Sequence, residues 1–104
     1  MTRIVIRGGT ALDHTGERRV DVAIADGRVV EVGQSLDGDQ ILDATDCIVA
    51  PGFVDLHVHL REPGREDAET IETGSRAAAL GGFTAIVAMP NTEPAQDSLA
   101  VIEF

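Results

Sequence analysis

The chain has 104 residues, 43 % of them hydrophobic, so it is long enough for a small core and is not predicted to be disordered. Eight basic residues, all arginine, stand against 18 acidic ones, and the formal charge of −10 argues against nucleic acid or an anionic membrane surface as a partner. The single cysteine, Cys47, excludes a disulfide within the chain. We expect Cys47 in the core and the protein in the cytoplasm, a reducing compartment, because no apolar run suits a signal or membrane segment.

Residues 1–50 are predicted to form a small antiparallel β unit without a ligand site. The alternation in "RIVIRGG" predicts a first strand. Two alternating runs in "RVDVAIADGRVVEVG" are joined by Asp26-Gly27, which favours a hairpin because glycine accepts the positive φ of a tight turn. "QILDATDCIVAPG" adds one or two short strands. His14, in the polar run "LDHTGERR", is predicted to be an exposed loop residue.

Residues 51–104 are predicted to form a strand, a helix and a second strand. "FVDLHVHL" predicts the first strand, and "AETIETGSRAAALGG" has helical spacing with Gly81-Gly82 as its stop. "FTAIVAMP" is nearly continuously apolar, which is typical of a parallel strand buried on both faces. Together they predict a right-handed βαβ unit. A last helix, capped by Asp97 or Ser98, is expected in "LAVIEF", and because the chain stops inside this pattern we expect an N-terminal piece of a longer protein.

The first of these strands has faces of opposite character, because side chains alternate across a strand. One face carries Val54, Leu56, Val58 and Leu60, and the other carries Phe53, Asp55, His57, His59 and Arg61. In an α/β barrel the apolar face packs on the surrounding helices. The polar face then looks into the barrel, with its last residues at the mouth where active sites lie.

The polar face offers metal chemistry. His57 and His59, two positions apart, can aim two imidazoles at one ion, and imidazole is a good ligand for zinc. The alternative is a pair of strand histidines satisfied by hydrogen bonds. Asp55 can accept an N–H from a ligand imidazole or its surroundings, as carboxylates near metals do, or it can bond to the backbone.

Two further residues suggest recognition of an anion. Arg61 beside a metal dication is favourable only with an anion between them, so its natural partner is a substrate carboxylate, held by two hydrogen bonds. The alternative is a surface ion pair with Glu62 or Glu66. Asn91 follows the second strand, and its amide suits a cyclic imide or a carboxylate, although an asparagine taken alone is more often a turn residue.

"APGFVDLHVHLREPG" followed by "AMPNTEP" resembles dihydroorotase of the long, bacterial and multienzyme type, in the amidohydrolase superfamily. The resemblance covers the whole chain. It implies an α/β protein: the start of a metal-dependent TIM-like (β/α)8 barrel, truncated after its second strand and preceded by a small antiparallel β-sandwich segment. Residues 1–50 are then the sandwich segment, incomplete without the C-terminus of the full chain, and residues 51–104 are the first βαβ portion of the barrel.

The resemblance also implies a function and a site. The reaction is reversible hydrolysis of the cyclic amide of dihydroorotate to N-carbamoyl-aspartate, in de novo pyrimidine synthesis, at a centre of one or two zinc ions. His57 and His59 are then metal ligands, and Arg61 and Asn91 bind the substrate carboxylate. Catalytic residues are expected downstream of Phe104, so the piece alone is predicted to be inactive.

Two other functions stay open. One is another cyclic amidohydrolase, such as an allantoinase or a hydantoinase, whose family patterns lack the arginine at position 61. The other is a non-catalytic dihydroorotase-like subunit that partners aspartate transcarbamoylase. The expected partners are a small-molecule substrate and either further copies of the chain or aspartate transcarbamoylase, with no nucleic acid and no membrane.

Overall fold

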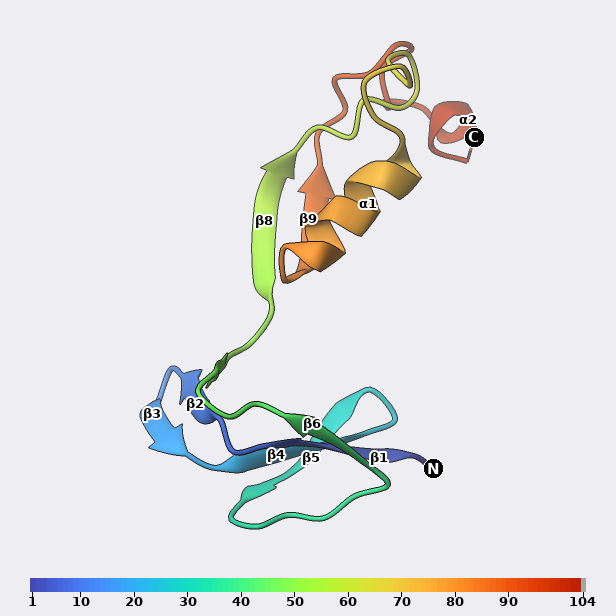
Figure 1. Ribbon diagram of the computed structural model, residues 1–104. Helices are drawn as coiled ribbons and strands as arrows, with labels where there is room; N and C mark the ends of the chain where they lie inside the picture. The colour runs from blue at the N-terminus through green and yellow to red at the C-terminus, as the bar shows by residue number, and fades with distance from the viewer. Residues whose placement is uncertain (104) are drawn as a thin grey trace. The chain divides into compact units, whose positions relative to one another are not determined.

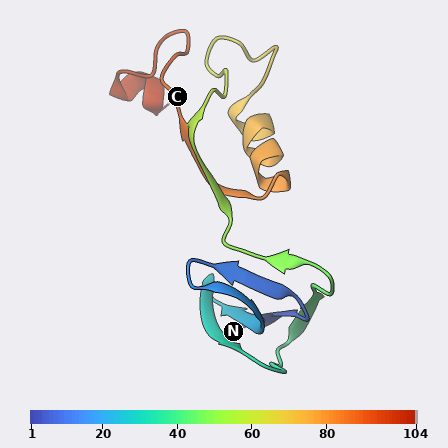
Figure 2. The same cartoon turned by 90° about the vertical axis from the view of Figure 1, so that its left-hand side faces the viewer.

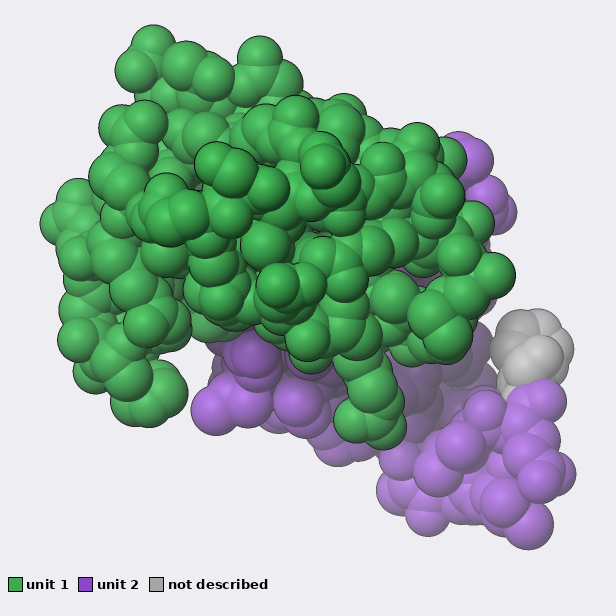
Figure 3. All heavy atoms as spheres, turned by 90° about the horizontal axis from the view of Figure 1, so that it is seen from below, with its two compact units in different colours: residues 1–51 green, residues 52–104 purple. Residues whose placement is uncertain are grey.

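The computed structural model describes residues 1–103 of a mixed α/β chain, and its class is therefore as predicted. The chain divides into two compact units, residues 1–51 and 52–104, which Figure 3 shows in separate colours. Within residues 1–103, no helix has the length and apolar character needed to cross a membrane.

The first unit contains two small sheets. Their strands are β1 (Arg3–Arg7), β2 (Thr10–Asp13), β3 (Gly16–Arg19), β4 (Asp21–Ala25), β5 (Arg28–Gly33), β6 (Gln40–Asp43) and β7 (Ile48–Val49). One sheet has the order β5-β4-β1-β6 and the other β3-β2-β7. The prediction of a purely antiparallel unit is wrong, since β6 runs parallel to β1 and β7 parallel to β2. Alternation reveals which residues share a face, but it carries no information about the direction of the neighbouring strand.

Two hairpins shape this unit. The predicted turn at Asp26-Gly27 is confirmed, with φ of 51° and 72°, between β4 and β5. A second hairpin, β2–β3, lies in the polar run that was expected to be a loop. Its turn signal is Asp13, whose Oδ1 accepts hydrogen bonds from Thr15 N at 2.8 Å and Thr15 Oγ1 at 2.5 Å. His14 is exposed in this turn, as predicted.

The core of the first unit is small and does not include the cysteine. Val5, Ala23 and Leu36 form its buried cluster. Cys47 is exposed, so its predicted place in the core is wrong. It lies in the turn between β6 and β7, where its backbone N–H donates to the carbonyl of Ala44 at 2.9 Å and the side chain stays outside.

The second unit is a strand, a helix and a strand. Its elements are β8 (Phe53–Val58), α1 (Ile71–Leu80), β9 (Phe83–Ala88) and α2 (Leu99–Ile102). β8 and β9 pair in parallel, as predicted, and the loops that follow them leave at the same end of the pair (Figures 1 and 2). The expected burial of β9 on both faces is wrong in residues 1–103: Val87 is 46 % exposed, and Leu56 of β8 is 70 % exposed. One helix is too narrow to cover a two-stranded sheet on both sides.

The predicted stop of α1 at Gly81-Gly82 is confirmed, and its start is set by a cap at Thr70. Thr70 Oγ1 accepts from Thr73 N at 3.1 Å, and Thr73 Oγ1 accepts from Thr70 N at 2.9 Å, a reciprocal capping box. Gly81 caps the other end. Ser98 is the N-terminal cap position of α2, as expected, but its side chain makes no capping bond. Phe104, the last residue of the predicted helix, lies outside the described residues.

Candidate functional site

His57 and His59 lie at the C-terminal end of β8 with their rings facing each other. The ring centroids are 5.2 Å apart and the ring planes meet at 67°. Two imidazoles on one tetrahedral zinc, with Zn–N bonds of about 2.0–2.1 Å, have ring centres about 5 Å apart. The same separation also suits an edge-to-face contact between the rings. The predicted convergence of the two side chains is therefore present.

Leu60 shows where the opposite face of this segment points. A Cβ added at Gly74 of α1 would come within 2.6 Å of Leu60 Cδ2, so the leucine lies directly against the helix. Leu60 was assigned by alternation to the apolar face. Its contact with α1 agrees with the expectation that this face meets a helix layer.

The Asp55 carboxylate bonds to the backbone of the same strand, two residues further on. Its Oδ1 accepts from the backbone N–H of His57 at 3.0 Å. Two partners were considered for this carboxylate, an imidazole N–H and the backbone, and in the structure it bonds to the backbone. The bond ties the carboxylate to the strand at the position from which the first imidazole projects.

Arg61 occupies an unusual backbone position. β8 ends at Val58, and Arg61 has a φ of 66°, in the left-handed region that is costly for a residue with a long side chain. The strand alternation that was extended to Arg61 therefore stops before it, and that step of the prediction is wrong. A turn closed by the bond from Arg65 N to Arg61 O, 2.8 Å long, sets the local backbone instead.

The surface ion pairs considered for Arg61 are not formed. Within residues 1–103 its guanidinium makes no ion pair. Glu62 Oε1 accepts from the backbone of Ile71 at 3.3 Å, and Glu66 Oε1 accepts from the backbone of Gly64 at 2.9 Å. Both carboxylates thus bond to backbone N–H groups, and the exposed guanidinium stays available to an anion.

Asn91 lies at the same sheet edge as the histidines. The backbone N–H of Met89 donates to the carbonyl of Val58 at 2.8 Å, which joins the two strand ends, and Asn91 is exposed two residues later. Beyond it, Glu93 N donates to Pro63 O at 3.0 Å, so the loops after β8 and β9 touch. The topology therefore gathers the predicted polar residues at one edge.

The described residues supply only some of the ligands that a metal site needs. Within residues 1–103, no cluster of three or more His, Cys, Asp or Glu side chains is arranged to hold a metal ion. Catalytic zinc sites use three protein ligands and structural ones four. The paired imidazoles of His57 and His59 fit as two members of such a set, and any further ligands must come from residues outside this range.

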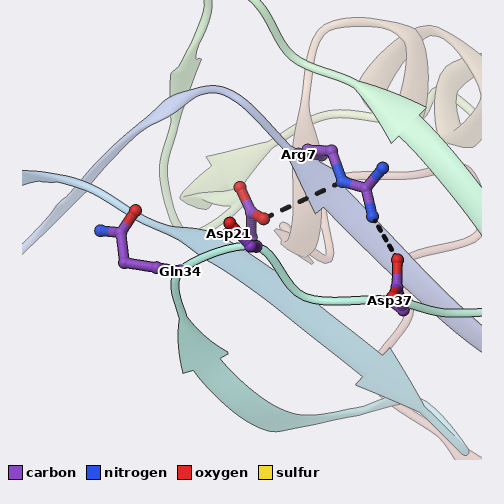
Figure 4. A pocket seen from close by; sticks show the side chains of 5 residues that line it. Arg7, Asp21, Gln34 and Asp37 are labelled. Atoms are coloured by element: carbon purple, nitrogen blue, oxygen red, sulfur yellow. Dashed lines mark hydrogen bonds and ion pairs between the residues drawn. The ribbon is translucent and has the colours of Figure 1, made fainter.

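A cleft in the first unit was not anticipated. It measures about 440 Å³ and is lined by Arg7, Asp21, Gln34, Ser35 and Asp37 (Figure 4). Arg7 bridges its two carboxylates: Nη2 lies 2.9 Å from Asp37 Oδ1, and Nε lies 4.0 Å from Asp21 Oδ2. Because one guanidinium holds both carboxylates, the cleft is a structural junction between β1, the start of β4 and the loop after β5. Charged residues inside apolar strand patterns were its only signal.

Asp21 is the buried centre of this crossing. Its carboxylate accepts from Gly8 N at 3.0 Å and from Leu36 N at 3.1 Å. The bond from Gly8 is the main reason that the pKa of Asp21 lies below its ordinary value; burial opposes it, while Leu36 and the Arg7 guanidinium add to the lowering.

Comparison with known proteins identifies the class to which this fold and site belong. Residues 46–104, more than half of the chain, match the family described as Dihydro-orotase-like, and the chain belongs to that family. Dihydroorotase from Solibacter usitatus is 55 % identical over 105 residues, which cover 97 % of this chain and 24 % of that protein. The resemblance to dihydroorotase is thus confirmed. The chain spans about a quarter of the length of this curated relative.

Solved structures show the same fold in related hydrolases. L-Hydantoinase (dihydropyrimidinase) from Arthrobacter aurescens superposes with a TM-score of 0.85 at 27 % identity, covering 99 % of this chain and 24 % of that one. N-acyl-D-glutamate deacylase from Bordetella bronchiseptica, complexed with zinc and a phosphonate inhibitor, has a TM-score of 0.67 at 31 % identity, covering 84 % and 18 %.

Proposed function

We propose that the chain is the N-terminal quarter of a dihydroorotase, a cytoplasmic enzyme that reversibly hydrolyses the cyclic amide of dihydroorotate to N-carbamoyl-aspartate. One observation carries this proposal. The paired imidazoles of His57 and His59, 5.2 Å apart, lie at the sheet edge where the loops bearing Arg61 and Asn91 meet. The dihydroorotase that is 55 % identical over nearly the whole chain supports the same reaction.

His57 and His59 are proposed to hold zinc, as one or two ions, together with ligands from outside this chain segment. A zinc-containing structure among the related hydrolases supports this choice. Bound zinc supplies a water of lowered pKa and polarises the scissile carbonyl. Asp55 holds the backbone of His57 in place, so it orients the strand end from which that imidazole reaches the metal.

Arg61 and Asn91 are proposed to bind the substrate carboxylate. The Arg61 guanidinium is exposed and has no ion pair within residues 1–103, and a planar guanidinium matches a carboxylate with two parallel hydrogen bonds. The Asn91 amide adds a donor from the neighbouring loop. Fixing the carboxylate holds the ring in one orientation, which turns a loose encounter into an aligned attack.

The fold proposal follows from what the second unit leaves uncovered. Val54 and Leu56 of β8 are 58 % and 70 % exposed, and Leu80 of α1 is 91 % exposed. Such apolar faces are covered when further strands and helices complete a (β/α)8 barrel. Residues 1–50 are proposed to be part of a β-sandwich. Pairing with further copies or with aspartate transcarbamoylase is proposed for the full-length protein and is testable by its mass in solution.

The first experiment removes the imidazoles in the full-length protein. His57→Ala and His59→Ala are expected to lower the zinc content and to reduce dihydroorotate turnover by roughly a hundredfold or more. His14→Ala is the matched control, because His14 is exposed in a turn of the first unit. Full zinc content and full turnover in both site variants would contradict the proposal.

A hydantoinase-like activity is the second candidate, favoured by the TM-score of 0.85 with L-hydantoinase. Comparing dihydroorotate with dihydrouracil, the same ring without the carboxylate, separates the two. Arg61→Gln is expected to raise KM for dihydroorotate about tenfold or more and to leave KM for dihydrouracil unchanged. Arg65→Gln, which removes the exposed pair with Asp67 in the same loop, is the control. Preference of the unmodified protein for dihydrouracil would favour the hydantoinase reaction.

A further inference from the structure

Gln96 joins the two loops that carry Arg61 and Asn91. Its side-chain Nε2 donates to the backbone carbonyl of Glu62 at 3.0 Å, and its own backbone N–H donates to the carbonyl of Pro90 at 3.1 Å. Glu62 directly follows Arg61, and Pro90 directly precedes Asn91. One residue therefore bonds to an immediate neighbour of each proposed carboxylate-binding residue.

The contact between the loops is close around this bond. Glu93 N donates to the carbonyl of Pro63 at 3.0 Å. Gly64 has a φ of 112°, and a Cβ at this position would lie 2.7 Å from the backbone oxygen of Glu93. The two backbones thus touch with no room for a side chain between them. Gln96 itself is half-buried, so its bond to Glu62 is partly shielded from competing water.

The loops need such a bond because neither has regular secondary structure to fix it. Residues 59–70 and 89–98 contain neither a helix nor a strand. Arg61 has positive φ, and its side chain is exposed and unpaired within residues 1–103. Without such a bond, the loop and the Arg61 guanidinium could adopt many orientations. Binding an anion would then have to order the guanidinium at an entropic cost.

We infer that Gln96 is a positioning residue, which sets the distance between the backbones that bear Arg61 and Asn91 without touching the substrate. This inference rests on the proposed function, since it assigns to the junction the task of preorganising the carboxylate site. Glutamine suits the task because its amide N–H reaches a carbonyl in the other loop while its backbone stays bonded in its own.

The test uses the full-length protein and separates KM from kcat. Gln96→Met keeps the side-chain length and removes the donor. It is expected to raise KM for dihydroorotate about three- to tenfold, the effect of one lost hydrogen bond, with kcat within about twofold and zinc content unchanged. The matched control is Gln34→Met, because Gln34 Nε2 also donates to a backbone carbonyl, that of Arg19, but within the first unit.

The outcomes are distinguishable. If the unmodified protein turns over dihydroorotate and Gln96→Met leaves KM unchanged, the inference is overturned and the proposed function stands. If the unmodified protein does not turn over dihydroorotate, the proposed function fails, and with it the positioning role. Should Gln96→Met lose zinc or fail to fold, Gln96→Leu, which also lacks the donor and adds no charge, decides by the same KM and kcat measurements.

Discussion

At the scale of single residues, the site depends on positions where backbone and side chain have different requirements. Arg61 keeps a long side chain at a φ of 66°, a conformation that costs roughly 1–2 kcal/mol for residues other than glycine. His57 and His59 turn polar rings toward each other at the end of a strand whose other face is apolar. Such local conflicts are characteristic of residues kept for chemistry, because stability alone would favour other residues there.

Arg61→Gly is predicted to separate stability from binding. Glycine removes the cost of the positive φ but loses about 0.5–1 kcal/mol in chain entropy, so the full-length protein is expected to be unchanged or up to about 1 kcal/mol more stable. Dihydroorotate binding is expected to weaken at the same time. Asp46→Gly, at a φ of 61° in the first unit, is the control that should match the stability effect and leave KM unchanged. Marked destabilisation by Arg61→Gly would show that its side chain supports the fold.

At the scale of elements, α1 is held by its N-terminal cap, by contact with β9 and by Leu60, which follows β8. The Thr70–Thr73 capping box satisfies two backbone N–H groups at the end that follows the Arg61 loop. Glu62 bonds to Ile71 at the same end. The helix start and the loop after β8 are therefore linked, and loosening the cap is expected to disturb both.

Thr70→Ala is predicted to destabilise α1 by about 0.5–2 kcal/mol, the usual cost of losing a cap. The measurement is hydrogen exchange of the Gly74 amide, which bonds to the carbonyl of Thr70. Ser98→Ala is the control, because Ser98 occupies the equivalent position of α2 without a side-chain bond. This substitution should change stability by no more than about 0.5 kcal/mol. Equal effects of the two substitutions would contradict a role for the capping box.

At the scale of the whole molecule, the first unit is expected to be sensitive to acid through Asp21. The pKa of Asp21 is lower in the folded than in the unfolded state. The carboxylate therefore stabilises the fold fully above the ordinary aspartate pKa of about 4, and this stabilisation is lost as the pH falls through the pKa of the folded state. The carboxylate bonds to Gly8 and Leu36, which lie far apart in the sequence. Its protonation therefore loosens a junction between a strand end and a distant loop.

Asp21→Asn is predicted to speed hydrogen exchange of the Gly8 and Leu36 amides near pH 7. The difference from the unmodified protein should narrow below about pH 4, where the native carboxylate is itself being protonated. Asp37→Asn is the control, because the Asp37 side chain is 97 % exposed and its pair with Arg7 is screened by water. A difference that does not change with pH would exclude the charge of Asp21 as the cause.

Periodicity predicted the elements well and their environment less well. The strands around Asp26-Gly27, the C-terminal limit of α1 and the parallel pairing of β8 with β9 follow from local patterns and short-range turn chemistry. The parallel partners of β1 and β2, and the exposure of Cys47, depend on contacts between distant segments that no local pattern encodes. The histidine pair was predictable from alternation, whereas Gln96 was not, because its role depends on a bond to a residue 34 positions away.

The meeting of the two loops has a consequence for the order of events during synthesis. Within residues 1–103, the hydrogen bonds that join β8 and the loop after it to residues 89–98 involve no residue beyond Gln96. The contact between the two loops can therefore form before α2, at Leu99–Ile102, has been made.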